Sequence, residues 1–446
     1  MSPISNSNLV VDTLIETRWI IPVEPQGVIL EHHALAVRDG RIVDLLPQAQ
    51  ARVRYVANKT VTLPQHVLLP GLVNLHTHAA MSLLRGYADD VALMDWLNHH
   101  IWPAEAQHVA PGFVRDGVLL ACAEMLRGGI TCFNDMYFFP EATAEAALRM
   151  GMRVALGILT IDFPTAYASD GDDYLSKGLA IRDSLRDEPL IRFCMAPHAP
   201  YSVSDRHLEQ VATMAAQLDL PIHIHVHETR AEIEQSLRQH GVRPLERLAK
   251  LGLVGPELIA VHVVHLEGHE IALLAEQGCS VAHCPVSNLK LASGMAPVAD
   301  LLCAGVRVGL GSDGAASNNR IDLFREMNLA TLLAKAVSGD ASVLDVHQVL
   351  RMATLNGAQA LGLADQIGSL LVGKQADLCA VRLDDLVLQP CFNPAAHLVH
   401  VAGREHVSHV WIAGNLKVDM GFLCGMDAAE LLDIAIMWQN RISAGL

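Results

Sequence analysis

The segment Leu72-Val73-Asn74-Leu75-His76-Thr77-His78 follows Leu68-Leu69-Pro70-Gly71 and ends at two histidines that are separated by one residue. Successive side chains of a β-strand point to opposite faces, so residues i and i+2 share a face. We therefore expect His76 and His78 to project to the same side from the end of one strand. Neutral imidazoles bind zinc and other first-row metals well, so the pair is half of a candidate metal site. Two polar residues that merely close a strand would give the same pattern.

This segment is the first of eight apolar runs that alternate with amphipathic stretches. Helical patterns such as Phe113 to Arg127 and Asp205 to Leu218 lie between the runs, and two more, at 320–335 and 343–354, follow the last one. Eight strand–helix alternations indicate a parallel sheet that closes into a barrel. The strands are expected at residues 72–76, 130–135, 152–159, 190–196, 221–226, 258–263, 279–283 and 306–311.

Both ends of the chain are rich in short strand patterns. Arg38-Asp39-Gly40-Arg41 carries the Asp-Gly signal of a hairpin, and Ala413-Gly414-Asn415 lies at the tip of a second one. We expect the two ends to meet in one small β-sandwich, and a helix from Ala428 to about Arg441 to follow it. The predicted fold is an α/β fold, a distorted (β/α)8 barrel of the TIM type at 67–367, with the halves of the sandwich at 1–66 and 368–446.

Composition excludes several classes of partner. The 446 residues carry a net charge of −16 and no run rich in lysine or arginine, which argues against nucleic acid and anionic membranes. No segment approaches the roughly 20 apolar residues of a membrane span, and the start of the chain lacks the pattern of a signal peptide. The nine cysteines are scattered without a C-x-x-C pair, which is typical of reduced thiols. We expect a cytoplasmic protein.

Chemically active side chains follow five of the eight predicted strands. Parallel barrels carry their functional groups at the carboxyl ends of the strands. The fifth run holds three histidines on one face, and which of them is a ligand stays open at this point. Glu228 lies three residues beyond His225, where the chain turns into a loop, and this position suits a general acid/base beside a metal. The strand-end groups are His76 and His78; His223, His225, His227 and Glu228; His262 and His265; His283; and Asp313.

With these segments the sequence resembles the amidohydrolase superfamily, and within its chlorohydrolase-like branch the 5'-methylthioadenosine/S-adenosylhomocysteine deaminases. The resemblance extends from about residue 10 to the end of the chain. The matching segments are Pro70-Gly71-Leu72-Val73-Asn74-Leu75-His76-Thr77-His78, His225-Val226-His227-Glu228-Thr229, His262, Ala282-His283-Cys284-Pro285-Val286-Ser287-Asn288-Leu289-Lys290-Leu291 and Gly311-Ser312-Asp313-Gly314-Ala315-Ala316-Ser317-Asn318-Asn319.

The resemblance implies one divalent cation. In such an enzyme Asp313 accepts a proton from the attacking water, His262 orients that water, and Glu228 carries protons to the purine ring nitrogen. Zinc suits the ligands best, and iron, nickel or manganese also bind such a set. Two-metal members bridge their ions with a carboxylated lysine on the fourth strand, and residues 190–196 contain no lysine. The implied ligands are His76, His78, His225 and Asp313.

The resemblance also suggests how a purine nucleoside is held. Glu105 would bind the ribose hydroxyls, Trp96 would line the pocket, and His198 would contact the substrate; a solvated Glu105 at a helix end is the alternative. His283 would either contact the substrate or brace the loop after it. Met81 and its leucine neighbours offer an apolar slot for a 5' thioether. The arginines that a charged 5' tail requires do not align with Arg182, Arg186 or Arg192, which favours methylthioadenosine or adenosine over S-adenosylhomocysteine.

Two alternative functions remain open from the sequence. One is a deaminase of another purine, or an aminohydrolase or chlorohydrolase of s-triazine-like rings. The other is a metal-binding scaffold without catalysis, against which the intact acid/base Glu228 argues. The expected partner is a small purine nucleoside, and we expect a homo-oligomer, a dimer or larger.

Overall fold

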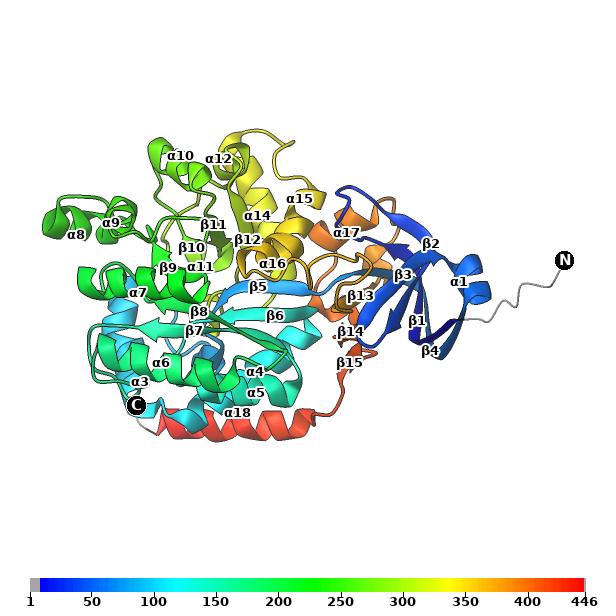
Figure 1. Ribbon diagram of the computed structural model, residues 1–446, viewed down its shortest axis with the longest axis horizontal. Helices are drawn as coiled ribbons and strands as arrows, with labels where there is room; N and C mark the ends of the chain where they lie inside the picture. The colour runs from blue at the N-terminus through cyan, green and yellow to red at the C-terminus, as the bar shows by residue number, and fades with distance from the viewer. Residues whose placement is uncertain (1–8, 445–446) are drawn as a thin grey trace.

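The computed structural model describes residues 9–444, and within this range the strands form two sheets of eight strands each (Figure 1). Sheet A combines both ends of the chain in the order β16-β15-β14-β13-β4-β1-β2-β3. Its strands are β1 (Leu9–Ile20), β2 (Leu30–Arg38), β3 (Arg41–Pro47), β4 (Tyr55–Pro70), β13 (Leu378–Arg382), β14 (Val407–Ile412), β15 (Asn415–Asp419) and β16 (Phe422–Leu423).

The second sheet is parallel and follows the chain order from β5 to β12. Helices alternate with its strands, so the predicted (β/α)8 barrel with a separate β-structure from the two chain ends is confirmed. The barrel strands are β5 (Leu72–Thr77), β6 (Ile130–Asp135), β7 (Arg153–Thr160), β8 (Ile191–Pro197), β9 (Ile222–Val226), β10 (Leu258–His262), β11 (Ser280–His283) and β12 (Arg307–Leu310).

Most of the helices surround the barrel in Figure 1, whereas α1 lies beside sheet A, and several helices begin where the sequence places a cap. Asp170 and Asp322, for example, accept hydrogen bonds from backbone N–H groups in the first turns of α6 and α14. The helices are α1 (Gln48–Arg54), α2 (Leu93–Trp96), α3 (Trp102–His108), α4 (Pro111–Arg127), α5 (Pro140–Met150), α6 (Gly171–Leu185), α7 (Asp205–Leu218), α8 (Arg230–His240), α9 (Pro244–Lys250), α10 (Gly268–Glu276), α11 (Pro285–Lys290), α12 (Val298–Cys303), α13 (Ala315–Asn318), α14 (Leu323–Ser338), α15 (Val346–Arg351), α16 (Gly357–Ala360), α17 (Pro394–His400) and α18 (Ala428–Ser443).

The barrel is distorted where its first and last strands meet. Side chains and loop backbone join the two: the N–H of Asp313 donates to the carbonyl of His76 at 3.0 Å, and the N–H of Ser312 donates to Asn74 Oδ1 at 2.9 Å. A β-carbon on Gly311 would lie 2.8 Å from Cβ of His76, closer than such atoms approach. Glycine at this position therefore lets the end of β12 reach the end of β5, which brings Asp313 beside the histidines.

Polar contacts join the C-terminal part of the chain to the barrel, and two of them involve buried groups. Arg153, at the start of β7, is fully buried and forms a two-armed ion pair with Asp377, with N–O distances of 3.1 and 3.2 Å. Helix α18 runs along the barrel beside α4 (Figure 1), and Trp438 Nε1 donates to Asp116 Oδ2 at 2.9 Å. Buried polar groups of the C-terminal segment thus bind it to the barrel.

Most predicted elements occur within one or two residues of their expected bounds. The Asp-Gly hairpin is present, with Arg38 opposite Arg41 and positive φ at Asp39 and Gly40. The sequence did not predict α1 or the full length of β4, because the segment from 48 to 70 alternates poorly. The domain boundaries at residues 67 and 367 stay predictions. None of the helices in the described part of the chain is long and apolar enough to cross a membrane.

Candidate active site

Three strand ends of the barrel bring three histidines and one aspartate together. His76 and His78 follow from β5, His225 from β9, and Asp313 from the loop after β12; we call these four residues the His/Asp cluster. The Nε2 atoms of His76 and His225 are 3.2 Å apart. Asp313 Oδ1 lies 3.3 Å from Nε2 of both His76 and His78. Ligand atoms of His76, His78 and His225 thus lie within 4.8 Å of one another, and Asp313 adjoins two of these histidines. Ligand atoms of His76, His262 and Asp313 form a second, overlapping group.

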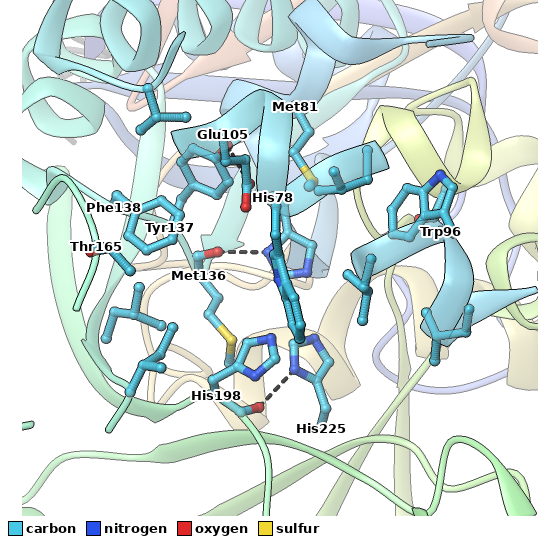
Figure 2. A pocket seen from close by; sticks show the side chains of 18 of the residues that line it. His78, Met81, Trp96, Glu105, Met136, Tyr137, Phe138, Thr165, His198 and His225 are labelled. Atoms are coloured by element: carbon cyan, nitrogen blue, oxygen red, sulfur yellow. Dashed lines mark hydrogen bonds between the residues drawn. The ribbon is translucent and has the colours of Figure 1, made fainter. Parts of the chain in front are cut away.

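Backbone carbonyls orient two of these imidazoles. Nδ1–H of His78 donates to the carbonyl of Met136 at 2.6 Å, and Nδ1–H of His225 donates to the carbonyl of His198 at 2.7 Å (Figure 2). A carbonyl only accepts, so the proton of each ring sits on Nδ1 and the lone pair of Nε2 faces the cluster. This is the outward hydrogen bond that metal-bound histidines usually make.

The aspartate of the cluster is oriented in the same way. Asp313 Oδ2 accepts from the hydroxyl of Ser287 at 2.6 Å, and Oδ1 accepts from the N–H of Gly314 at 2.7 Å. Asp313 has a φ of 59°, and His262 has a φ of 71°. Such left-handed backbone is strained for residues other than glycine and is concentrated at functional sites. The fold thus holds both residues in an unfavourable conformation that aims them at the cavity.

Burial sets the charge states that a cation requires. It lowers the pKa of His76 to about 4 and that of His225 well below its usual range, so both rings are neutral near pH 7. Burial by itself would raise the pKa of Asp313, but its close interaction with the neighbouring histidines, His76 first, brings that pKa well below its ordinary value. Neutral imidazoles and an ionised carboxylate are the forms that bind metals, so the donor set fits a divalent cation.

Glu228 and His262 lie beside the cluster. His262 Nε2 is 3.9 Å from Glu228 Oε2, and its Nδ1–H donates to Asn288 Oδ1 at 2.8 Å. The backbone N–H of Glu228 donates to Glu232 Oε2 at 2.8 Å. Burial raises the pKa of Glu228, which makes its protonated form more accessible near neutral pH.

A cavity of about 610 Å³ opens onto these groups. Glu105, which is buried, accepts from the hydroxyl of Tyr137 at 2.7 Å, and burial raises its pKa to about 7. Trp96 donates from Nε1 to the carbonyl of Ala88 at 3.0 Å. Figure 2 shows Glu105, Tyr137 and Trp96 around His78. The lining residues from the sequence prediction are His78, Met81, Trp96, Glu105, His198, His225, Glu228, His262 and Asp313.

An irregular helix places Trp96 and Glu105 on the same cavity. Helices α2 and α3 are joined by a π-helical turn at Leu97–Ile101. In a regular α-helix, with about 100° per residue, two residues nine positions apart point in opposite directions. The wider π turn absorbs an extra residue and brings both side chains to one side. This turn explains how two predicted substrate residues from one helix both line the cavity.

Other predicted residues lie outside the cavity. His227 donates from Nδ1 to the carbonyl of His265 at 3.2 Å and accepts from the N–H of Leu245 at 3.0 Å, so its ring is engaged away from the cluster. His283 is buried and borders a separate small cavity next to Asn288. His223 is buried behind His76, with which it shares a hydrogen bond of 2.9 Å.

The sequence prediction missed several residues that orient or line the site. Ser287 and Asn288 lie in a segment that matches the family, but the segment assigns them no role, and Glu232 lies outside the matching segments. The pattern Thr229-x-x-Glu232 is a capping-box signature, and Thr229 does cap α8, so it was a usable signal for Glu232. Tyr137, Trp102 and Phe163 also line the cavity, but they lie outside any motif, and nothing in the sequence marks them.

Comparisons with known proteins agree with this geometry. A profile described as the amidohydrolase family matches residues 67–417. The chain belongs to the amidohydrolase family. Members of this family are metal-dependent, so this amidohydrolase is a metal-dependent hydrolase, and the family resemblance found in the sequence is confirmed.

Several curated and solved relatives cover this amidohydrolase almost end to end. It is 47% identical to a 5-methylthioadenosine/S-adenosylhomocysteine deaminase of Teredinibacter turnerae, over 97% of this chain and 98% of that one. A deaminase of the same name from Saccharophagus degradans is 46% identical over 97% of each chain.

Solved structures give the same picture. An adenosine deaminase of Xanthomonas campestris with bound zinc is 51% identical, with a TM-score of 0.97 over 98% of this chain and 100% of that one. An atrazine chlorohydrolase of Arthrobacter aurescens complexed with zinc is 26% identical, with a TM-score of 0.88 over 96% of this chain and 99% of that one.

Proposed function

We propose that this amidohydrolase deaminates an adenine nucleoside by hydrolysis, with 5'-methylthioadenosine as its preferred substrate. The products are 5'-methylthioinosine and ammonia. One observation carries the proposal: a single cavity joins the His/Asp cluster and Glu228 to a buried carboxylate, Glu105, that is suited to ribose hydroxyls. The names of the relatives in Teredinibacter and Xanthomonas support the same activity.

The His/Asp cluster would hold one divalent cation, and we propose zinc. Nε2 of each of the three histidines and Oδ1 of Asp313 would be the ligands. Such a cation lowers the pKa of a water ligand toward about 7 and so supplies hydroxide at neutral pH. Strand β8, the fourth of the barrel, has no lysine to bridge a second cation, which supports a single ion.

The residues around the cluster would move the protons of the reaction. Water adds to C6 of the purine while protonated Glu228 donates to the adjacent ring nitrogen, so negative charge does not build up on the ring. His262 accepts a hydrogen bond from the water at Nε2, because Asn288 fixes the proton of its ring on Nδ1. The carboxylate of Asp313 takes the proton of the water and returns it to the amino group. The C–N bond then breaks and ammonia leaves. C6 becomes a carbonyl as the proton that remained on its oxygen passes to the carboxylate of Glu228, which restores the starting form of the enzyme.

The lining of the cavity supports an uncharged 5' group. Among residues 9–444, no lysine or arginine lines it, and Arg182, Arg186 and Arg192 all lie elsewhere. The carboxylate of an S-adenosylhomocysteine tail would therefore lack a cationic partner, which makes its desolvation costly. Apolar side chains such as Ile101, Trp102 and Phe163 offer contacts to a thioether instead.

The direct test is ammonia release by the zinc-loaded enzyme. The panel is methylthioadenosine, adenosine, S-adenosylhomocysteine, guanine and a chlorotriazine. We expect methylthioadenosine to have the highest kcat/KM. Glu228→Gln should keep its zinc and lose about 10²–10⁴-fold in kcat, the usual contribution of a general acid.

A matched control and two contrary outcomes complete the test. Glu234 lies on α8 with an exposed side chain, so Glu234→Gln should leave kcat unchanged. Turnover of only guanine or the triazine would overturn the nucleoside assignment. Full activity of Glu228→Gln would overturn the role of Glu228. A homo-oligomeric assembly and a cytoplasmic location stay predictions from the sequence.

A further inference from the structure

His223 occupies a position that the reaction does not use. It lies in β9, two residues before His225, and its side chain is fully buried. Its Nε2 is 2.9 Å from Nδ1 of His76, and the two ring centroids are 4.9 Å apart. His223 does not belong to the His/Asp cluster and does not line the large cavity. Its one side-chain partner in the described part of the chain is therefore a ring of that cluster.

The partner of His76 differs in kind from the partners of His78 and His225. Those two rings donate to backbone carbonyls, which can only accept, so their tautomers are fixed. The ring of His223 can either donate or accept. The tautomer of His76 therefore depends on which nitrogen of the His223 ring carries its proton.

Only one of the two arrangements leaves His76 ready to bind a cation. Nε2 of His76 offers its lone pair to the cluster only when its proton is on Nδ1, and Nε2 of His223 must then accept that proton in a hydrogen bond. The proton of His223 must in turn sit on its own Nδ1, which is buried and has no hydrogen-bond partner among the described residues. In the reverse arrangement, His76 carries its proton on Nε2, only 3.3 Å from Asp313 Oδ1, and blocks the site.

We propose that His223 is a positioning residue that holds His76 in its Nδ1–H tautomer and thereby sets the affinity of the site for its cation. Partners that orient metal-bound histidines typically contribute 10- to 100-fold to metal affinity. The proposal rests on the cation site of the proposed function, and it is independent of which nucleoside is turned over.

The test measures zinc binding without substrate. Metal-free enzyme is titrated with zinc against a chromophoric chelator, and the Kd is compared among variants. His223→Leu and His223→Met fill the space without an acceptor, and we expect both to raise the Kd 10- to 100-fold. His223→Gln places an amide oxygen near the lost Nε2, so it should accept from His76 and keep the Kd within about threefold of the wild type.

His227→Leu is the matched control. His227 is also buried and lies just beyond the same strand, but its ring is hydrogen-bonded to His265 and Leu245. Its loss should leave the zinc Kd within about threefold. Circular dichroism of each metal-free variant reports whether the fold is retained. If one of His223→Leu and His223→Met does not fold, the other still provides the test.

Three outcomes would overturn the proposal. The first is that folded His223→Leu or His223→Met binds zinc as tightly as the wild type. The second is that His223→Gln binds zinc as weakly as those two variants. The third is that His227→Leu weakens zinc binding to the same extent as they do. Failure of methylthioadenosine turnover with normal zinc binding would instead count against the proposed function and leave the role of His223 intact.

Discussion

Buried and partly buried histidines gather in two regions of this molecule, at the strand ends of the barrel and in sheet A. Burial lowers the pKa of His66 in sheet A to about 4, as it does for His76 in the barrel. The geometry differs. The rings of His66 and His409 are 6.2 Å apart, and His409 faces Ser408 and Asp419 instead of His66. In the His/Asp cluster, by contrast, Asp313 Oδ1 lies 3.3 Å from two ring nitrogens.

A lowered histidine pKa therefore does not by itself identify a metal site. Both shifts have the same first cause, the cost of charging a ring that is removed from water. Convergence of lone pairs on one point requires further groups that fix each ring, such as the carbonyls of Met136 and His198. In sheet A the ring nitrogens of His66 and His409 do not converge with other ligand atoms, so we assign these two histidines a structural role.

The largest expected effect comes from breaking the convergence itself. Asp313→Asn removes a ligand charge and the proton acceptor, so we expect kcat/KM for methylthioadenosine to fall more than about 10³-fold and zinc content to drop. Ammonia release and metal analysis measure the two effects. Chelation of zinc from the wild type should give the same loss, reversed by added zinc. Substantial activity of metal-free Asp313→Asn would contradict the assignment of the cluster.

The second prediction concerns the ion pair that joins the two regions. Asp377→Asn leaves the buried Arg153 without a charged partner, and we expect a loss of about 3 kcal/mol in the free energy of unfolding. Denaturant unfolding of zinc-loaded protein measures it. The exposed pair of Glu246 and Lys250 is the control, because Glu246→Gln should cost less than about 0.5 kcal/mol. Equal losses for the two variants would show that Arg153 needs no partner.

The third prediction applies the same burial argument to the substrate end of the cavity. Burial raises the pKa of Glu105 to about 7, and the hydrogen bond from Tyr137 opposes this rise. The ionised form binds ribose hydroxyls better, so the KM for methylthioadenosine should rise about tenfold as the pH falls from 8.5 to 5.5. Tyr137→Phe should move the inflection to higher pH, and Glu105→Gln should abolish it.

Steady-state kinetics of zinc-saturated enzyme across this pH range provide the measurement. The kcat of each variant, followed alongside, separates binding from the proton transfers at Glu228. A wild-type KM that stays constant over the range would remove Glu105 from the ribose site.

The smallest expected effect is in sheet A. The test substitution is His409→Gln. His409 lies far from the cluster in sequence, and among the described residues it contacts Ser408, Asp419 and its aromatic neighbours. We expect zinc content and kcat/KM to change less than about twofold, as measured by the two assays used for Asp313→Asn. A marked loss of zinc would mean that sheet A contributes to metal binding and would erase the contrast between the regions.

The local sequence predicted much of this molecule. Eight apolar runs, each bounded by turns, predicted the barrel strands. The carboxyl ends of parallel strands share an edge, so residues at the ends of these runs were expected at one rim of the barrel. These residues are His76, His78, Glu228 and Asp313. The choice of His225 over His223 and His227 came from the family resemblance, since a period of two puts all three on one face.

Only the tertiary structure decided how these residues are held. Met136, His198, Ser287 and Asn288 orient the cluster and His262 from separate loops, through contacts that no local pattern encodes. The aromatic wall of the cavity and the lack of lysine and arginine in its described lining also arise from distant segments. Strand identity follows from the period of neighbouring side chains, whereas hydrogen-bond partners depend on which loops the closed barrel brings together.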